Sequence, residues 1–416
     1  MEKLREKAQK ILLKNLKKGF SKNLKKNYFY ISPDKEHYHQ WFWDSCFHII
    51  VMSEFNTQYA INELETLLSV QKDNGFIPHI IFWNFRLKDR FKIWWKKEQD
   101  PDYKFFTAEI QPPVIALSLK KLYKKSGDKE MLKKFIFKIE RYYEYLERER
   151  DPDRDSLISI ITPMESGMDL SPQYDIVFQN FEFDPQNSVK KITEILFFYK
   201  KINWDLNIIF EKEIFDVEDV AFNTIYALSL NSLSFLFKEI GEENKSEYYR
   251  KKYEEVKDKI IKKFWNEEDK IFYSLYHRNK KEEKMKVKTI SSLFPLCLDI
   301  PEYYVNHLLS HLTDPEKFFL NYPVPSVSRD EKSFGPLTDT RFLWRGTTWV
   351  NTNWFIYKGL LRHNKKDLAD IIKKKTEELI EKFGFCEFYD PLTGYPGKAM
   401  RDFSWSTLIV DFKHDE

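Results

Sequence analysis

Cysteine and glycine are both scarce in this chain of 416 residues. It contains three cysteines, Cys46, Cys297 and Cys386, and 11 glycines. An odd number of cysteines with no metal-binding spacing predicts neither a disulfide framework nor a cysteine-bound metal, and reduced thiols indicate a cytoplasmic protein. The low glycine content, with 17 prolines and 17% aromatic residues, favours long packed helices over a β-rich or disordered chain.

The chain also lacks an excess of charge of either sign. Its 68 Lys and Arg residues are balanced by 65 Asp and Glu residues, and the two signs are intermixed. Because nucleic-acid-binding proteins concentrate basic residues on one face, we expect no nucleic-acid partner. No secretory signal is evident, and no apolar run approaches the length of a membrane span. The apolar residues near the N-terminus share one helical face and are interpreted as a first scaffold helix, so no membrane partner is expected.

Apolar residues recur at helical spacing along most of the chain. A short β-hairpin is expected at 264–273, with the charged segment 277–288 as its solvated flank. Two long irregular stretches, 75–103 and 313–341, have the character of ordered functional loops, and no segment resembles a linker, so we expect one domain over residues 1–416. Apolar residues recur at helical spacing in these segments: 4–18, 42–54, 57–71, 104–126, 129–149, 187–201, 218–239, 243–264, 302–312, 348–363, 365–383 and 403–412.

Two acidic motifs stand in apolar or aromatic surroundings. The first, PMESGMDLSPQYD at 163–175, contains three carboxylates, and the second, FCEFYDPLTG at 385–394, places Glu387 near aromatic residues. Burial disfavours the charged form of a carboxyl group, so its pKa rises and it can donate a proton near neutral pH. Two such groups suggest glycoside hydrolysis. The alternative for the first motif is a helix cap with a solvated acidic edge.

Six motifs in a fixed order carry a resemblance to a known family. They lie at 41–45, 71–79, 111–113, 163–175, 344–351 and 385–405. In this order the chain resembles glycoside hydrolase family 63, in the branch that contains mannosylglycerate and glucosylglycerate hydrolases. The resemblance implies an all-α (α/α)6 toroid of six helical hairpins with long functional loops. It also implies an inverting α-glycosidase acting on a small α-glucoside or α-mannoside, such as glucosylglycerate or mannosylglycerate.

The resemblance assigns the two catalytic roles. Asp169 is implied as the general acid and Glu387 as the general base. From the residues alone, Glu165 competes with Asp169, because the two are four residues apart and would share a helix face. Glu165 and the nearby Gly167 are therefore kept as substrate-binding candidates. Glu387 has a structural alternative, a buried ion pair with an arginine at 345 or 401.

Sugar binding requires aromatic walls and directed polar groups. The resemblance implies that Asp44 contacts hydroxyls of the cleaved sugar, and its alternative is a helix N-cap. Trp41, Trp344 and Trp349 are candidates to pack on sugar rings, although each of the 11 tryptophans is also a candidate core residue.

Three further polar residues are weaker candidates. Gln111 and Asn353 carry amides suited to sugar hydroxyls, but an amide near proline serves equally well to satisfy backbone groups in a turn. Arg345 either orients the general base or ties helices together.

Metal and cofactor motifs are not found. His307 and His311 are four apart, but Leu308 stands where a metalloprotease carries its glutamate. The pair His37 and His39 has no third ligand in view. There is no phosphate-binding glycine-rich loop and no G-x-S-x-G motif. We expect no metal and no cofactor, and a small carbohydrate as the substrate.

The sequence departs from the family pattern in ways that affect the substrate. Met164 replaces a tryptophan, Leu343 an aromatic residue and Thr347 a proline, and residues 155–249 contain no arginine to bind a glycerate carboxylate. Two alternatives stay open: an α-glucosidase acting on uncharged oligosaccharides or glycosides, and a noncatalytic sugar-binding toroid. If the substrate is a glycerate, the candidate cations are Lys212, Arg86, Arg90 and Arg341.

Overall fold

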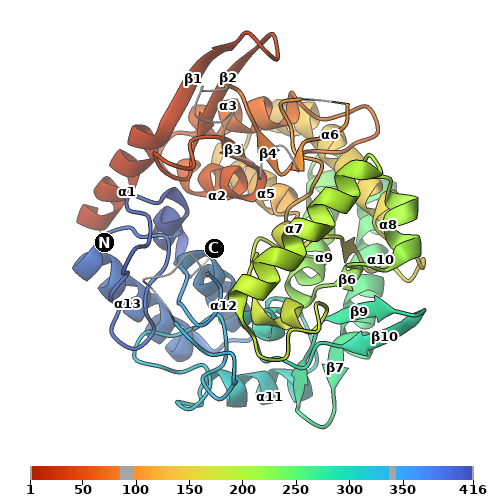
Figure 1. Cartoon of the computed structure of the whole chain (residues 1–416). Coiled ribbons are helices and arrows are strands. Elements are labelled where there is room, and N and C mark those ends of the chain that lie inside the picture. Colours follow the sequence, from red (N-terminus) through yellow and green to blue (C-terminus); the bar gives the residue numbers. More distant parts are fainter. Residues whose placement is uncertain (1, 85–97, 103, 337–342, 415–416) are drawn as a thin grey trace.

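Helices arranged in two concentric layers make up most of the computed structural model, which describes residues 2–84, 98–102, 104–336 and 343–414 (Figure 1). The inner layer consists of α2 (Phe42–Met52), α5 (Ile115–Ser126), α9 (Val220–Glu239), η5 (Ile290–Cys297), α12 (Val350–Arg362) and η6 (Ser404–Asp411). The outer layer consists of α1 (Glu2–Asn15), α3 (Thr57–Leu68), α6 (Lys129–Glu149), α10 (Glu243–Lys259), α11 (Glu302–Leu312) and α13 (Lys366–Phe383).

The inner layer closes on itself. Each inner helix contacts the next in the order α2, α5, α9, η5, α12, η6, and η6 contacts α2 again. Each also contacts one outer partner, in the pairs α2 with α3, α5 with α6, α9 with α10, η5 with α11, α12 with α13, and η6 with α1. The described residues therefore form six helix pairs in a closed ring, the predicted (α/α)6 toroid. Two inner members, η5 and η6, are 3-10 helices.

Burial explains which helices are inside. Every residue of α2 is buried, whereas α6 exposes charged side chains along one face and buries an apolar stripe. A helix that is apolar on all sides must be surrounded by protein, and an amphipathic helix covers it. The apolar length of Val220–Glu239 in α9 suffices to span a membrane, contrary to the sequence expectation, but 89% of its apolar window is buried inside the ring.

Short sheets and extra helices decorate the ring. β1 (Leu16–Ser21) and β2 (Lys26–Ile31) form an antiparallel hairpin with Leu16 opposite Ile31. An antiparallel sheet in the order β10-β9-β6-β5 comprises β5 (Ser159–Ile160), β6 (Val217–Glu218), β9 (Leu275–Arg278) and β10 (Lys281–Lys284). The remaining pairs are β3 (Gln40–Trp41) with β4 (Ile80–Ile81) and β7 (Trp265–Asn266) with β8 (Ile271–Phe272).

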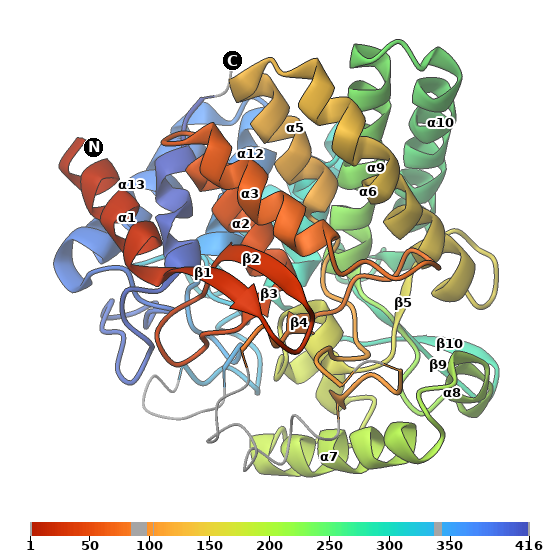
Figure 2. The ribbon, with the colours of Figure 1, turned by 90° about the horizontal axis from the view of Figure 1, so that it is seen from above.

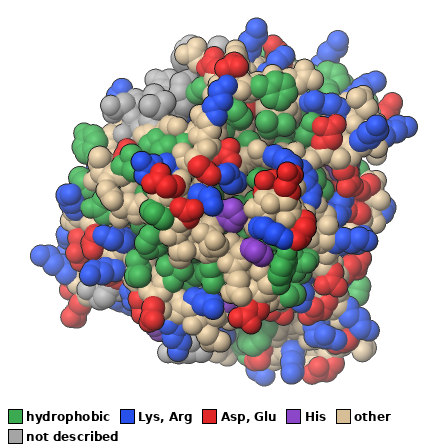
Figure 3. Space-filling view, turned by 90° about the horizontal axis from the view of Figure 1, so that it is seen from below, with side chains coloured by type: hydrophobic (Ala, Val, Ile, Leu, Met, Phe, Trp, Pro, Cys, Tyr) green, Lys and Arg blue, Asp and Glu red, His purple; other side chains and the backbone are tan. Residues whose placement is uncertain are grey.

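The two ends of the ring differ. From the side, the ring helices occupy one end, and α7 (Pro185–Lys201), β9, β10 and the connecting loops occupy the other (Figure 2). The remaining short helices are α8 (Leu206–Lys212), η2 (Pro163–Ser166), η3 (Pro172–Asp175) and the π-helix η4 (Ile260–Phe264). On the face drawn in Figure 3, the described acidic and basic side chains are interspersed without a patch of one sign.

Several predicted elements need correction. The helix expected at 104–126 begins only at Ile115, because Pro112 and Pro113 lack the backbone N–H groups that a helix interior needs. The segment 403–412 is a 3-10 helix, and the charged segment 277–288 contributes β9 and β10 instead of an unstructured flank. The hairpin at 264–273 is confirmed as β7 and β8. All three cysteines are buried and free.

Candidate active site

A cavity of about 100 Å³, here called the acidic cavity, lies where the N-terminal ends of inner helices meet the loops. Trp41 and Trp349 are the N-cap residues of α2 and α12, and Asp44 lies in the first turn of α2. The lining residues are Pro33, His37, Trp41, Trp43, Asp44, Gln111, Gly167, Asp169, Leu343, Trp344, Trp349, Glu387, Phe403 and Trp405. Motifs separated by more than 300 residues in the sequence therefore meet at one place.

Eight of the eleven predicted site residues line this cavity. They include both predicted catalytic residues, Asp169 and Glu387. Glu165, Arg345 and Asn353 do not line it.

Gly167 places Asp169 against the cavity wall. It ends η2 in the left-handed region, with φ 71°, and a Cβ atom at this position would lie 2.6 Å from the Trp43 ring. Only glycine meets both conditions without displacing its neighbours. The chain can therefore turn tightly over Trp43 before it reaches Asp169.

Burial raises the pKa of both catalytic candidates towards neutrality. The pKa of Asp169 rises to about 6 and that of Glu387 to about 7. Glu387 shows the larger rise, although a general base must be ionised in the resting enzyme. The positive charge of His37 acts in the required direction, because it favours the ionised form of Glu387. Both carboxyl groups can thus exchange protons in the neutral pH range.

His37 was not identified from the sequence as a residue of this site. Its Nδ1 atom lies 2.7 Å from Oδ2 of Asp34, and its ring packs edge-on against Trp41 and Phe403. Burial lowers the pKa of His37, but the hydrogen bond and charge of Asp34 outweigh this effect and raise it to about 8. His37 is therefore a cation at neutral pH. The sequence pattern that could have identified His37 is Asp34 three residues before it, shortly ahead of the motif at 41–45.

Buried polar atoms without partners indicate what the cavity accommodates. Oδ1 of Asp44, Nε1 of Trp41 and Nε1 of Trp349 are buried and have no hydrogen-bond partner among the described residues. Such groups are costly unless a ligand or water satisfies them. A carboxylate acceptor beside two indole donors suits a ligand with several hydroxyl groups. Asp44 is not an N-cap, because the cap of α2 is Trp41.

Gln111 is fixed by one of its two polar atoms. Its Oε1 accepts a hydrogen bond of 3.0 Å from the backbone N–H of Trp43. The amide nitrogen is left to meet a ligand in the acidic cavity, which agrees with the predicted binding role.

Trp344 and Trp349 form an aromatic wall. Their rings stack with centroids 3.7 Å apart and planes 4° from parallel, and Trp349 also contacts Phe388 and Trp405. Packing on both sides fixes the orientation of these rings. A rigid apolar surface of this kind suits the C–H face of a sugar.

Glu165, a predicted substrate-binding residue, does not line the acidic cavity and has the contacts of a structural residue. Both of its carboxylate oxygens accept hydrogen bonds from the fully buried Arg150, at 2.6 and 2.8 Å. They also accept backbone N–H groups of Ile110 and Ile161. Glu165 therefore holds together the chain segments that contain Ile110, Arg150 and Ile161, and it does not line the acidic cavity. Its ion-pair partner lies 15 residues upstream, outside any local motif.

Arg345 does not line the acidic cavity, and its contacts fit the second of the two roles considered from the sequence, that of tying segments together. It donates to Oδ1 of Asp175 at 2.8 Å and to the carbonyl oxygen of Phe183. Arg401 donates to the carbonyl oxygen of Phe383 and to Sγ of Cys386. Neither of these hydrogen-bond sets includes Glu387, so the ion-pair alternative for Glu387 is not supported.

Asn353 is likewise satisfied within the protein. Its Oδ1 accepts from the N–H of Val324, and its Nδ2 donates to the carbonyl oxygen of Pro323 and to Oγ1 of Thr376. No amide atom of Asn353 is left over for a sugar hydroxyl.

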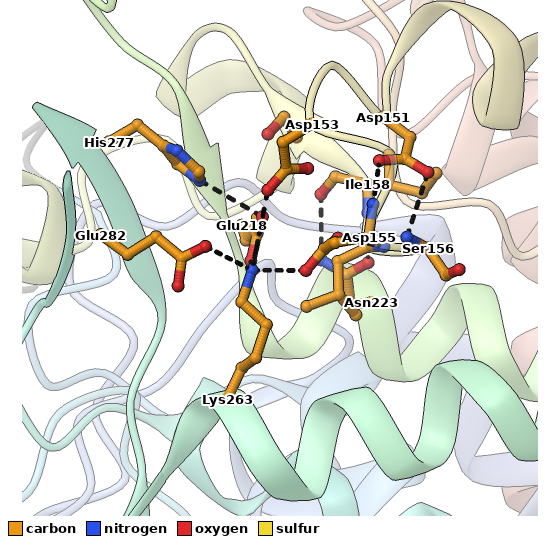
Figure 4. Close-up of polar contacts among 12 residues, drawn as sticks. Asp151, Asp153, Asp155, Ser156, Ile158, Glu218, Asn223, Lys263, His277 and Glu282 are labelled. Carbon is orange, nitrogen blue, oxygen red and sulfur yellow. Dashed lines mark hydrogen bonds and ion pairs between the residues drawn. The ribbon is translucent and has the colours of Figure 1, made fainter. Parts of the chain in front are cut away.

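Acidic clusters that could hold a metal lie elsewhere and already surround a cation. Carboxylates of Asp155, Glu218 and Glu282 contact the ammonium group of Lys263 (Figure 4). His277 lies 3.3 Å from Glu218 in the same group. Lys263 therefore supplies the positive charge in this cluster. The histidine pairs considered from the sequence belong to neither of the candidate metal-binding groups found among the described residues.

Of the predicted cations for a glycerate carboxylate, the structure describes only Lys212. Lys212 lies exposed in α8 and is not among the residues that line the acidic cavity. Arg86, Arg90 and Arg341 lie outside the described residues. Of the lining residues that the structure describes, only His37 carries a positive charge, and it is already paired with Asp34.

A toroid with two buried carboxyl groups in an aromatic cavity defines the chain as a glycosidase-like protein, and comparison with known proteins identifies the family. The chain belongs to the mannosylglycerate hydrolase MGH1-like glycoside hydrolase domain family, whose model matches residues 37–406. It is accordingly a glycoside hydrolase of family 63, a family of inverting α-glycosidases.

Several relatives show the extent of the similarity. The mannosylglycerate hydrolase of Thermus thermophilus is 28% identical over 403 residues, which cover 90% of this chain and 94% of the relative. The glucosylglycerate hydrolase of Mycolicibacterium hassiacum is 25% identical over 423 residues, covering 89% and 91%.

Solved structures agree with the fold. A mannosylglycerate hydrolase of Thermus thermophilus in complex with Tris and D-glycerate superposes with a TM-score of 0.84 at 26% identity, covering 98% of this chain and 99% of that chain. The same enzyme has been solved with glucose, and this structure gives a TM-score of 0.82. Neutral trehalase of Saccharomyces cerevisiae, at 12% identity and a TM-score of 0.59, shares the fold and covers 97% of this chain and 79% of its own.

Proposed function

We propose that the protein hydrolyses an α-glucoside or α-mannoside of glycerate, with Asp169 as general acid and Glu387 as general base. The observation that carries the proposal is the presence of both carboxyl groups on one cavity, each with its pKa raised by burial to about 6 and about 7. Acid–base catalysis is most effective when the pKa of the catalytic group lies near the working pH.

The residues account for each proton and bond in the reaction. Asp169 donates its proton to the glycosidic oxygen as the bond between that oxygen and the anomeric carbon breaks. Glu387 removes a proton from a water molecule, whose oxygen forms a bond to the anomeric carbon on the opposite face. The products are the sugar with inverted configuration and the free aglycone alcohol. Asp169 is left ionised and Glu387 protonated, and exchange with solvent restores both.

The remaining cavity residues hold the sugar in place. Asp44 and the indole N–H groups of Trp41 and Trp349 are the unsatisfied polar atoms available for hydroxyl groups. The amide nitrogen of Gln111 adds a further donor, and the stacked Trp344 and Trp349 rings offer an apolar surface. Directed hydrogen bonds to a fixed ring select one orientation of the anomeric carbon towards the two acids.

The relatives support a glycerate aglycone, because one is a mannosylglycerate hydrolase and another is a glucosylglycerate hydrolase. An uncharged aglycone is the second candidate, and a specific observation favours it: the described lining of the acidic cavity contains neither Lys nor Arg. A buried carboxylate without a cationic partner would be bound poorly.

One kinetic comparison separates these candidates. We would measure kcat/KM for glucosylglycerate, mannosylglycerate and the matching glycosylglycerols, which lack the carboxylate, at two salt concentrations. A glycerate hydrolase favours the acids and loses part of this preference at high salt, because salt screens the contact. Equal or higher rates on glycosylglycerols would assign the enzyme to uncharged glycosides. Binding of the sugars without any turnover would leave only the noncatalytic toroid.

A further inference from the structure

A second cavity, here called the basic cavity, lies at the opposite end of the inner helices. Its volume is about 210 Å³, twice that of the acidic cavity, and the two share no lining residue. Arg362 lines it from the last turn of α12, 13 residues after Trp349, which corresponds to about 20 Å along a helix axis. Its lining residues are Ile50, Leu117, Lys120, Lys121, Lys124, Leu228, Cys297, Trp354, Phe355, Lys358, Arg362 and Asp411.

Cationic groups dominate the polar lining. The described lining contains four lysines and one arginine but a single carboxylate, Asp411. Asp411 already pairs with Lys121 at 2.5 Å and with Lys358 at 3.3 Å. In a chain whose acidic and basic residues nearly balance, this is a marked local excess of positive charge.

The neighbouring acid Glu54 does not neutralise this excess, because three lysines already surround it. It pairs with Lys121, Lys125 and Lys413 at 2.7 to 3.2 Å. Burial would raise the pKa of Glu54, but these ammonium groups lower it to about 2.

Two cations of the basic cavity have no carboxylate partner among the described residues, Lys120 and Arg362. Lys120 Nζ lies over the ring of Phe235, 4.8 Å from its centroid. Burial, together with the charges of Lys124 and Arg362, lowers the pKa of Lys120 to about 8. The positive charges of Lys120, Lys124 and Arg362 thus repel one another in this cavity.

Stabilisation of helix ends accounts for only some of these residues. Basic residues in the last turn of a helix favour its negative end, and Lys124 and Arg362 occupy such positions in α5 and α12. Lys120 lies in the middle of α5, where this effect has faded. The stabilisation of a helix end therefore does not explain the charge of Lys120, and we expect a bound group to balance it.

The walls of the basic cavity are apolar. Trp354, Phe355, Leu117 and Leu228 line it beside the cationic groups. Nε1 of Trp354 donates to Oδ2 of Asp411 at 2.9 Å, which holds the indole in place. Pockets that combine apolar walls with a few converging polar groups are typical of small-molecule sites.

We propose that the basic cavity binds a small organic phosphate, with the phosphate between Lys120 and Arg362 and an apolar body against Trp354 and Phe355. A phosphate dianion neutralises both unpaired cations at once, whereas a carboxylate leaves one unpaired. Arginine also binds phosphate oxygens through two parallel hydrogen bonds. This site is separate from the hydrolytic one and does not depend on the proposed substrate.

The test is calorimetric titration of the whole protein with phenyl phosphate, inorganic phosphate and phenol. We expect phenyl phosphate to bind roughly tenfold or more tightly than inorganic phosphate, because its ring is buried, and phenol not to bind measurably. K120M and R362M should each weaken binding by about tenfold or more. The matched control K251M, at an exposed position of α10, should leave it unchanged.

Proton uptake gives a second readout. A phosphate beside Lys120 raises the pKa of Lys120, so the protein should take up protons on binding near pH 8. Near pH 6 the phosphate ester itself titrates, with a second pKa of about 6, and binding of its dianion should instead release protons from the ligand. K120M should abolish this uptake, which is measured by titration in buffers of different ionisation enthalpy. Equal binding by K120M, R362M and the unmodified protein, absence of phenyl phosphate binding, or equal affinity for phenol would overturn the proposal. Since no step of this test uses hydrolysis, a wrong substrate assignment leaves its outcome unaffected.

Discussion

The imidazole of His37 and the carboxylate of Asp34 form an ion pair of 2.7 Å at the acidic cavity, and the charge of His37 favours the ionised form of Glu387, the proposed general base. The pair connects the loop after β2 to the chemistry of a residue 350 positions later. It also makes the ionisation of Glu387 dependent on a group that is not itself a reactant.

Replacement of His37 by glutamine should shift the pH dependence of the reaction. His37 lowers the pKa of Glu387, so loss of its charge should raise that pKa above about 7 and leave Asp34 as an uncompensated negative neighbour. Because only the form with Asp169 protonated and Glu387 ionised is active, a higher pKa of Glu387 should lower the active fraction most at acidic pH. Activity should fall more at pH 6 than at pH 8. His414→Gln, at an exposed histidine, is the control, and an unshifted profile would exclude this role for His37.

Substitutions D169N and E387Q should each abolish most turnover. Each removes one proton-transfer role, and such roles contribute roughly a hundredfold to ten-thousandfold. Initial rates on the best substrate of the glycoside panel measure the loss, and thermal unfolding checks that the fold is intact. E144Q, at an exposed position of α6, is the matched control. Near-native activity in either variant would remove that residue from the mechanism.

The stereochemical outcome is a separate prediction. Proton NMR of the first-formed sugar should show the β-anomer from an α-linked substrate, because water attacks opposite the leaving group. Retention would mean that one carboxylate acts as a nucleophile. Since D169N and E387Q would be inactive in either case, only this measurement distinguishes the two mechanisms.

Glu165→Gln should destabilise the fold. The substitution leaves the charge of Arg150 buried without its partner, and breaking a buried ion pair costs about 3 to 5 kcal/mol. Denaturant unfolding measures this free energy. Asp44→Asn is the informative comparison, because it should keep stability while weakening substrate binding and turnover. Native stability of Glu165→Gln with a raised KM would support the substrate-binding role predicted from the sequence.

Lys263→Met should make stability dependent on calcium. Removal of the ammonium group leaves Asp155, Glu218 and Glu282 without their common cation, at a cost of about 3 to 5 kcal/mol. Carboxylate oxygens are suitable calcium ligands, so millimolar calcium should raise the Tm of the variant but not that of the unmodified protein. A variant with unchanged Tm, or an equal calcium effect on both proteins, would argue against this role for Lys263.

Local sequence patterns predicted the helices better than the contacts between distant segments. The helices at 129–149 and 302–312 match the structure because apolar spacing alone determines their buried face. The motif at 163–175 predicted an acid in the site but not which of its carboxylates lines the cavity. Glu165 does not line it because it pairs with Arg150, and this contact joins two separate segments of the chain. His37 was missed for the same reason: Asp34 is visible nearby in the sequence, but Glu387 is not.

Because η6 closes the inner ring, the ring can be completed only after residues 404–411 have been synthesised. Helices α1 and α2 are synthesised first, yet their contacts with η6 await the last part of the chain, as when His48 meets Ser404 through a hydrogen bond of 2.5 Å. Asp44 and Glu387 can face the same cavity only after this step. Contacts of such high sequence separation slow folding, and a ribosome-bound chain lacking 385–411 carries an open ring with an exposed apolar edge. Hydrolytic activity therefore requires that residues 385–411 have been synthesised and have joined the ring.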